Sequence, residues 1–504
     1  MKSTRILSFF LICLGLAGLP SAALSVELQV KKLEADIQKA LADFQVPGLA
    51  IGIVKEGVPV YTKGFGFRTI NGREPVDEKT VFGLGSASKT FNAGLAAVLV
   101  QAGSIKWDDK VVRHLPGFRL YDEWVTKETT VRDLLSHRTG VAETDNLGLL
   151  FIGSRFSRED VVAKAKYLPP LIEFRTGWFY SNIMYIAAGQ MMAEVSGQSW
   201  DDCLREKIFA PLGMNSSSTS IGAFAPGDNL ATPHWYVDCH PTPIPWGNMD
   251  TAGPAGSVNS SAADLVKWLQ VHLNGGSLAG AILWGPDIQE EMFSPHSLLV
   301  NIPIGWKTSF STYGLGWFIS DYRGRKVVWH GGNCDGMSCV IGMLPENKMG
   351  VVILQNTFPT RFEYDLMLRI MDMESDLPET AWRSLGEAQP ISMAIKKYVP
   401  GPDDRPIDRA TFGKYLGFYS SDLFGESEVR IEGERVVLRF KGFPSAMFRA
   451  RGENVFIADF GEGASGMFGL LLGQRTWEEV KFSLAEDGSV RDMKVDRFGV
   501  FKKK

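Results

Sequence analysis

Ser86 and Lys89, three positions apart, are the first residues in this 504-residue chain whose types and spacing could do chemistry. A serine hydroxyl is a poor nucleophile at neutral pH and needs a base within hydrogen-bond reach. On a helix, positions i and i+3 share a face, so we expect the Lys89 amine beside the Ser86 hydroxyl. An amine that is buried, or close to another cation, gives up its proton more readily and can be that base. The pattern predicts a lysine-activated serine nucleophile, although Ser-x-x-Lys alone recurs by chance.

Tyr180 and Asn182, in the run Tyr180-Ser181-Asn182, form a second group. A tyrosine oxygen can transfer a proton where nearby cations favour its ionised form. An asparagine side chain can donate to a substrate carbonyl and accept from a substrate amide. The alternative is a tyrosine that packs in the core and an asparagine that caps a turn.

The run His330-Gly331-Gly332-Asn333 is the third group. A glycine pair on an edge strand lets a substrate lie against the backbone. The amide of Asn333 could then form an oxyanion hole with the amide of Ser86. The alternative for His330 is a buried structural histidine. No cysteine or histidine pair has the spacing of a zinc site, so we expect no metal.

The elements that must position these groups can be predicted from hydrophobic periodicity. They are a β-hairpin at Leu49–Phe67 turning at Glu56-Gly57, a helix after Ser86, a short helix at Thr130–Ser136, a helix at Leu265–Leu273 opened by a capping box at Ser261, and strands at Tyr313–Ile319, Val327–His330, Ser338–Leu344 and Gly350–Gln355. Strands and helices do not alternate regularly. The pattern is therefore α+β.

Composition divides the chain into four parts. Residues 377–409 hold five prolines and scattered charges, as linkers often do. Beyond the linker the hydrophobic period becomes two, which predicts hairpins of a small all-β domain over residues 410–504. We therefore expect a signal peptide at 1–25, a hydrolase domain at 26–376, the linker and the β domain.

The first 25 residues have the order of a secretory signal. Lys2 and Arg5 precede the apolar run Ile6–Leu19, and small residues follow Pro20. The alternative is an uncleaved anchor, but the run is shorter than the ~20 residues of a membrane span. The prediction is a secreted or periplasmic protein without a stable membrane span.

Charge and cysteine content narrow the classes of partner. The formal net charge is −4, so no basic excess exists for nucleic-acid binding. Four cysteines follow the predicted signal, at positions 203, 239, 334 and 339. Cys334 and Cys339 flank a predicted hairpin turn, and both a disulfide and two buried thiols are compatible with that spacing.

The order and spacing of the three groups resemble the serine β-lactamase and penicillin-binding-protein-like family, in its class C and D-aminopeptidase/esterase branch. Thr130–His137 and Tyr313–Trp317 carry the resemblance further, and it covers about Val26–Asp376. The family implies an antiparallel sheet flanked by helices, an all-helical subdomain, and a site between them. Residues from about Thr411 to the C-terminus resemble a small lipocalin-like β-barrel domain.

The resemblance implies that Ser86 forms an acyl-enzyme, with Lys89 and Tyr180 as base and then acid. Asn182 would orient the substrate amide. His330, with Gly331, Gly332 and Asn333, would line the pocket, and no metal or organic cofactor is needed. Family members that act on β-lactams often have lysine where His330 stands, and a histidine of ordinary pKa (~6.5) is mostly uncharged at neutral pH.

That departure favours esters, amides or D-amino-acid peptides over β-lactams. The expected partner is a small molecule or short peptide, including cell-wall fragments. A second hypothesis is a penicillin-binding or sensor protein that is acylated with little turnover. In either case the β domain could occlude or complete the active site.

Overall fold

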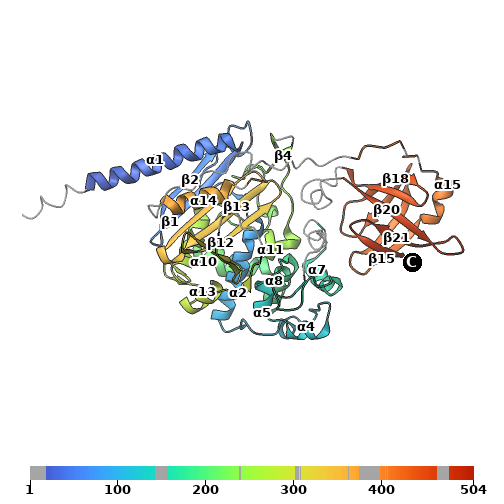
Figure 1. The fold of residues 1–504 in the computed structure, drawn as a ribbon, viewed down its shortest axis with the longest axis horizontal. Helices are drawn as coiled ribbons and strands as arrows, with labels where there is room; N and C mark the ends of the chain where they lie inside the picture. Colours follow the sequence, from blue (N-terminus) through green and yellow to red (C-terminus); the bar gives the residue numbers. More distant parts are fainter. Residues whose placement is uncertain are drawn as a thin grey trace, which may run out of the picture.

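The computed structural model describes residues 19–141, 154, 156–237, 240–300, 306, 308–360, 362–373, 398–402, 404–405, 407–461 and 476–504, with side chains from residue 30. These residues form a body of helices and strands and, after it, a β-barrel (Figure 1). Helix α1 (Leu19–Asp43) begins at Leu19, and Pro20 lies in its first turn, where proline is tolerated. Residues 1–18, on which most of the signal-peptide prediction falls, lie outside the described residues. Within the described part, no helix meets the length and hydropathy that a membrane span requires.

An antiparallel sheet of eight strands forms the centre of the first body. In spatial order the strands are β2 (Val58–Gly66), β1 (Gly48–Lys55), β14 (Met349–Gln355), β13 (Met337–Leu344), β12 (Arg325–Cys334), β11 (Phe318–Tyr322), β10 (Ser311–Tyr313) and β9 (Ser297–Leu298). Every residue of β13 and β14 is buried. Both faces of these strands are covered, which explains why their sequences are almost wholly apolar, with Ser338 and Gln355 as the polar exceptions.

Helices cover the two faces of the sheet (Figure 1). On one face, α1 and α14 (Phe362–Met373) share a core with Val340 and Ile353. On the other face, α2 (Ser88–Gln101), α8 (Asn182–Ser196) and α12 (Ala262–Leu273) belong to a core that includes the neighbouring strand residues Ile341 and Val352. The predicted fold class, a sheet flanked by helices with a helical subdomain, is confirmed.

Shorter elements complete the first body. The remaining helices are α3 (Val111–His114), α4 (Glu123–Glu128), α5 (Val131–Leu135), α7 (Arg158–Lys164), α9 (Trp200–Leu204), α10 (Ala210–Leu212), α11 (Gly253–Gly256) and α13 (Pro286–Met292). Three two-stranded sheets pair β3 (Phe82–Gly83) with β6 (Asn259–Ser260), β4 (His234–Val237) with β5 (His240–Pro243), and β7 (Ser277–Leu278) with β8 (Ala281–Ile282).

The single strand predicted at Tyr313–Ile319 is wrong. Strand β10 ends at Tyr313 and β11 begins at Phe318, with a tight turn between them in which the amide of Gly314 donates to the carbonyl of Trp317. Gly316 has a φ of +82°, and a Cβ there would lie 2.6 Å from the Cβ of Ala93 in α2. Glycine at 316 therefore lets the chain reverse directly against the helix that carries Lys89.

The C-terminal part is a closed barrel of eight strands, and this confirms the predicted small all-β domain. Its strands are β15 (Gly417–Ser421), β16 (Gly425–Glu432), β17 (Arg435–Phe440), β18 (Ala446–Gly452), β19 (Val455–Asp459), β20 (Trp477–Leu484), β21 (Val490–Val495) and β22 (Gly499–Lys503), preceded by the short helix α15 (Arg409–Phe412). Strand β15 pairs with β22 and closes the barrel. Phenylalanines fill the interior, as where Phe440 stacks on Phe498. The lipocalin resemblance and the exact domain boundaries stay predictions.

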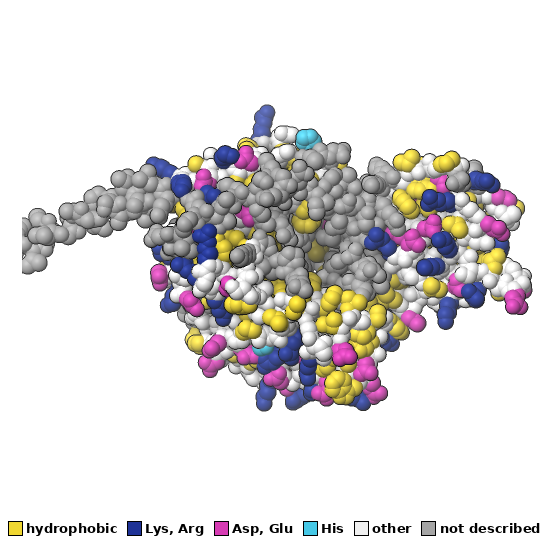
Figure 2. All heavy atoms as spheres, viewed as in Figure 1, with side chains coloured by type: hydrophobic (Ala, Val, Ile, Leu, Met, Phe, Trp, Pro, Cys, Tyr) yellow, Lys and Arg dark blue, Asp and Glu magenta, His cyan; other side chains and the backbone are white. Residues whose placement is uncertain are grey.

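The structure describes the distribution of surface charge on one face and the state of three cysteines. Figure 2 shows basic and acidic side chains interspersed over the described part of this face, without one extended basic patch. Cys203, Cys334 and Cys339 are buried free thiols, so of the two alternatives for Cys334 and Cys339 the structure has the thiols. Cys239 lies outside the described residues.

Candidate active site

Ser86 lies in a 3₁₀ turn, η1 (Gly85–Ala87), that leads directly into α2. The turn starts at Gly85, which has a φ of +49°. A Cβ at that position would stand 2.2 Å from the carbonyl oxygen of Asn333, so only glycine allows β12 to approach this closely. The half-buried Ser86 is thereby held between the helix start and the end of a central strand.

The Lys89 amine lies beside the Ser86 hydroxyl, as the spacing predicts. Its Nζ is 3.4 Å from Ser86 Oγ, and the lysine side chain is completely buried. Nζ donates to Asn182 Oδ1 at 2.6 Å and to the carbonyl oxygen of Ala255 at 2.9 Å. Both acceptors are neutral, so they orient the amine without the charge pairing that a carboxylate would give.

Tyr180 is the fourth member of this cluster. The Lys89 Nζ lies 4.6 Å from the centroid of the Tyr180 ring and 5.3 Å from that of Tyr185. The helix α8 begins at Asn182, so Tyr180 and Asn182 stand on either side of the turn that opens this helix. Two of the three groups singled out in the sequence therefore meet around one amine.

His137 holds the turn that carries Tyr180, a role that sequence reasoning missed. Its Nδ1 accepts a hydrogen bond from the amide of Ser181 at 3.0 Å, and its ring centroid lies 4.5 Å from that of Tyr180. Burial, followed by the positive charge of Lys89, holds the pKa of His137 well below its ordinary value. The ring therefore stays neutral and keeps an acceptor nitrogen for Ser181.

The end of strand β12, residues 330–333, lies against the 3₁₀ turn η1 that carries Ser86. A Cβ on Gly332 would lie 1.8 Å from the carbonyl oxygen of Leu84 and 2.8 Å from the amide nitrogen of Ala87. Strand β11 pairs with β12 only up to Trp329, so it does not cover the edge that follows. Ser86 and Asn333 thus present backbone on adjacent segments beside this edge, the arrangement that an oxyanion hole requires.

His330 is buried and uncharged. Its Nδ1 lies 2.6 Å from the carbonyl oxygen of Gly331 and therefore carries the proton, while Nε2 lies 2.9 Å from the Tyr313 hydroxyl and accepts from it. Burial, and next the charge of Lys89, lowers the pKa of His330 to about 3. His330 therefore has a structural role, through its hydrogen bonds to Tyr313 and to the Gly331 carbonyl. It offers no positive charge to a substrate carboxylate.

Two further contributors carried no usable signal in the sequence. The Ala255 carbonyl acts through its backbone, so its residue type says nothing. Tyr185 donates to the carbonyl oxygen of Leu135 at 2.5 Å while its ring faces the amine, and as a buried residue on α8 it is indistinguishable from core. Among the described residues, no group of His, Cys, Asp and Glu could hold a metal ion.

Comparison with known proteins extends the description beyond geometry. A family model described as Beta-lactamase matches residues 33–371. Over 430 residues the chain is 28% identical to an unguisins hydrolase, ungD', of Aspergillus campestris, covering 80% of this chain and 78% of that protein. It is 28% identical over 380 residues to penicillin-binding protein 4 of Amycolatopsis lactamdurans, covering 73% of this chain and 92% of the relative. The octameric penicillin-binding protein homologue from Pyrococcus abyssi has the same fold, with a TM-score of 0.59, 24% identity, and coverage of 94% and 100%.

Proposed function

Because the chain belongs to the Beta-lactamase family, we propose that it is an exported serine hydrolase that cleaves ester or amide bonds through an acyl-enzyme on Ser86. The observation that carries this proposal is the Lys89 amine, which lies 3.4 Å from Ser86 Oγ and is held by Asn182 and Ala255. Hydrogen bonds between catalytic groups are often long before substrate binds. The 3.4 Å separation between Nζ and Oγ is therefore compatible with a base whose hydrogen bond to the serine shortens when substrate binds.

The proposed reaction runs in two halves. Lys89 takes the Ser86 proton as Oγ attacks the carbonyl carbon, and the amides of Ser86 and Asn333 donate hydrogen bonds to the oxyanion. The proton then passes, through Lys89 and Tyr180, to the departing alcohol or amine. A water molecule, losing its proton to the same groups, hydrolyses the ester on Ser86 and restores the hydroxyl.

The neutral His330 bears on the substrate class. A lysine there would offer a fixed cation to a substrate carboxylate, whereas the buried imidazole remains uncharged. We therefore favour neutral esters and amides, including peptides with D-amino acids, over β-lactams. The relatives named unguisins hydrolases support turnover.

The test compares wild type with Ser86→Ala on p-nitrophenyl butyrate, a D-alanine p-nitroanilide and a chromogenic cephalosporin. We expect repeated turnover of the ester or the anilide, lost in Ser86→Ala, and intact-mass detection of an acyl adduct on quenched wild type. Hydrolysis that survives in Ser86→Ala would contradict the proposal.

A second candidate is a penicillin-binding protein that is acylated and turns over very slowly. The relatives named penicillin-binding protein 4 and 4* favour it. A fluorescent penicillin separates the two candidates. A stoichiometric Ser86 adduct that persists for hours, without hydrolysis of any substrate in the panel, would support the second candidate and exclude the first.

A further inference from the structure

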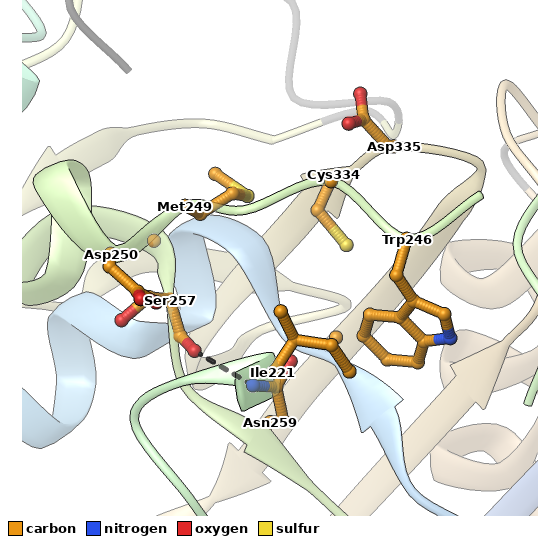
Figure 3. A pocket seen from close by; sticks show the side chains of 11 residues that line it. Ile221, Trp246, Met249, Asp250, Ser257, Asn259, Cys334 and Asp335 are labelled. Atoms are coloured by element: carbon orange, nitrogen blue, oxygen red, sulfur yellow. Dashed lines mark hydrogen bonds between the residues drawn. The ribbon is translucent and has the colours of Figure 1, made fainter. Parts of the chain in front are cut away.

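A partly enclosed cavity lies close to Ser86, and residues near the nucleophile in sequence or in space line it (Figure 3). Gly83 lines it two positions before Gly85, and Cys334 lines it directly after Asn333. A Cβ on Gly256, which also lines the cavity, would stand 3.9 Å from the carbonyl carbon of Gly85, the residue bonded to Ser86. The cavity is therefore a neighbour of the acylation site.

The position of the cavity bears on which part of a substrate could occupy it. A carbonyl carbon attacked by Ser86 carries two substituents, and the leaving group must reach the proton donors around Lys89 and Tyr180. Neither of those residues lines the cavity, and neither do Asn182 and His330. The cavity therefore suits the substituent that remains on the enzyme after the leaving group departs.

The walls of the cavity are mainly apolar. In Figure 3 the side chains of Ile221, Trp246, Met249 and Cys334 surround its centre. The indole nitrogen of Trp246 donates to the carbonyl oxygen of Ala231 at 3.0 Å, which fixes the position of this wall. Burial raises the pKa of the Cys334 thiol, so the sulfur is an uncharged surface.

Two carboxylates stand at the edges of the same cavity. Asp250 and Asp335 are its charged lining residues, and no basic side chain of the described chain lines it. Asp250 Oδ2 accepts from Ser220 Oγ at 3.0 Å and from Asn248 Nδ2 at 3.1 Å, so its position at the rim is held. A negatively charged acyl group would meet like charges here and is disfavoured.

Resting on the proposed function, we propose that this cavity is the acyl-side specificity site and takes a short, uncharged aliphatic substituent. Trp246 closes one side of the site and limits chain length. Gly256 leaves open the space that a side chain at 256 would fill, since a Cβ there would stand 2.9 Å from the flexible end of Met249. The substrate class is thus an ester or amide of a short aliphatic acid, or of an amino acid with a small apolar side chain.

The test uses p-nitrophenyl acetate, butyrate, hexanoate, octanoate and the anionic hemisuccinate. Each variant is scored by its kcat/KM ratios between esters, because a general loss of activity cancels in a ratio. Trp246→Ala is expected to raise the octanoate-to-butyrate ratio about tenfold, and Gly256→Ala to lower the hexanoate-to-acetate ratio by about the same factor. Asp250→Asn is expected to raise the hemisuccinate-to-butyrate ratio. Trp124→Ala, at an exposed tryptophan of α4, is the matched control.

The outcomes separate this inference from the proposed function. Ser86-dependent hydrolysis with unchanged ratios in Trp246→Ala and Gly256→Ala would overturn the inference alone. If wild type acylates without turnover, the same ratios are taken from the rates of adduct formation measured by intact mass. If no ester gives a Ser86 adduct, this inference fails, and if the D-alanine p-nitroanilide gives none either, the proposed function fails with it.

Discussion

Asn182 helps to orient the Lys89 amine, because its neutral Oδ1 accepts a hydrogen bond from Nζ at 2.6 Å. Asn182→Asp would place a carboxylate at the same distance and favour the charged ammonium. The amine would then accept the Ser86 proton only at higher pH. We expect the pH at which kcat/KM for p-nitrophenyl butyrate is half-maximal to move upward by about one unit or more, which a pH–rate profile measures.

The control is Asn347→Asp, which adds the same charge on an exposed turn and should leave the profile unchanged. A profile in Asn182→Asp that keeps its midpoint while only its height falls would mean that Lys89 is not the base.

His330 shows where reasoning from residue type reached its limit. The sequence allowed a pocket residue or a buried structural histidine, and the structure combines the two: the ring is buried and bonded to Tyr313, on the strand that borders the nucleophile. Its low pKa comes from burial, which no sequence pattern expresses. His137 was missed for a similar reason, since its hydrogen bond to Ser181 joins two segments 44 residues apart.

At the scale of elements, local signals predicted well and reversals between strands did not. The Glu56-Gly57 turn and the helix start at Ser261 were visible because their determinants lie within four residues. Gly57 has a positive φ, and the Ser261 side chain accepts from the amide of Asp264, although the reciprocal bond that would complete the predicted capping box is not formed. The strand predicted at Tyr313–Ile319 failed because Gly316 takes its conformation from contact with α2, a long-range cause. The alternating pattern of residues 429–440 predicted a hairpin, whereas closure of the barrel depends on pairing between its first and last strands.

The contact between β12 and η1 makes Gly332 essential for the proposed oxyanion hole. An alanine Cβ would meet the backbone of Leu84 at 1.8 Å, and backbone cannot rotate away as a flexible side chain can. The strand must shift, which separates the amides of Ser86 and Asn333. We expect Gly332→Ala to lower kcat for p-nitrophenyl butyrate by about 100-fold or more, as loss of one oxyanion donor does.

Steady-state kinetics on purified, folded protein checks this expectation. Gly117→Ala is the control, because a Cβ at Gly117 would meet nothing within 4 Å. A Gly332→Ala enzyme with nearly normal kcat would show that the strand approach is not needed for catalysis.

The helix α5 is joined to the loop before Tyr180 by one buried carboxylate. Asp133 pairs with Arg138 at 2.7 Å and with Arg175 at 2.6 Å, and it also closes the capping box with Thr130. Burial raises the pKa of Asp133, but the hydrogen bonds from Arg175 and Arg138 outweigh burial and lower it. Asp133→Asn would leave two arginines facing a neutral group, at a cost of about 3 kcal/mol in the free energy of unfolding.

Urea unfolding at pH 7 measures this cost, with the exposed Asp43→Asn as a control expected within about 0.5 kcal/mol of wild type. A carboxyl group with a lowered folded-state pKa stabilises above its unfolded pKa and loses that contribution as pH falls through the folded value. The difference between wild type and Asp133→Asn should therefore shrink below about pH 4. A difference that is the same at pH 7 and pH 3 would contradict the ion-pair explanation.

At the scale of the whole molecule, buried histidines set the response to acid. Burial lowers the pKa of His272 and of His330 to about 3 and that of His296 to about 4. The unfolded chain takes up protons near pH 6.5 while the folded chain does not, so stability is full above that pH and falls progressively toward pH 3. At pH 5, each fully buried histidine lowers the free energy of unfolding by up to about 2 kcal/mol.

We expect the urea midpoint of the first body to fall steeply between pH 6.5 and 5, before carboxyl groups with ordinary pKa values titrate. Tryptophan fluorescence reports this transition, since Trp268, Trp284 and Trp317 surround His272. A midpoint that stays constant down to pH 5 would mean that these rings already ionise in the folded state.

The barrel contacts the first body at Phe156, and a short series of contacts connects Phe156 to the Lys89 amine. Phe443 packs edge-on against Phe156 at 5.7 Å, and Gly442, with a φ of +83°, lies against the same ring. The carbonyl oxygen of Phe156 accepts from Thr251 Oγ1 at 2.8 Å. Thr251 belongs to the turn that leads into α11, whose Ala255 carbonyl binds Lys89. The contact therefore braces the segment that orients the base.

Gly442→Val tests whether this brace contributes to catalysis. A Cβ at 442 would stand 2.9 Å from the Phe156 ring and would also strain a backbone with positive φ, so the barrel should separate from the ring while both bodies keep their own cores. We expect kcat for p-nitrophenyl butyrate to fall several-fold, because the segment that orients the base is displaced. Phe418→Ala, at a ring 54% exposed on the barrel surface, should leave kcat unchanged. If Gly442→Val matches wild type while its barrel stays folded by circular dichroism, the barrel is attached to the hydrolase without supporting its chemistry.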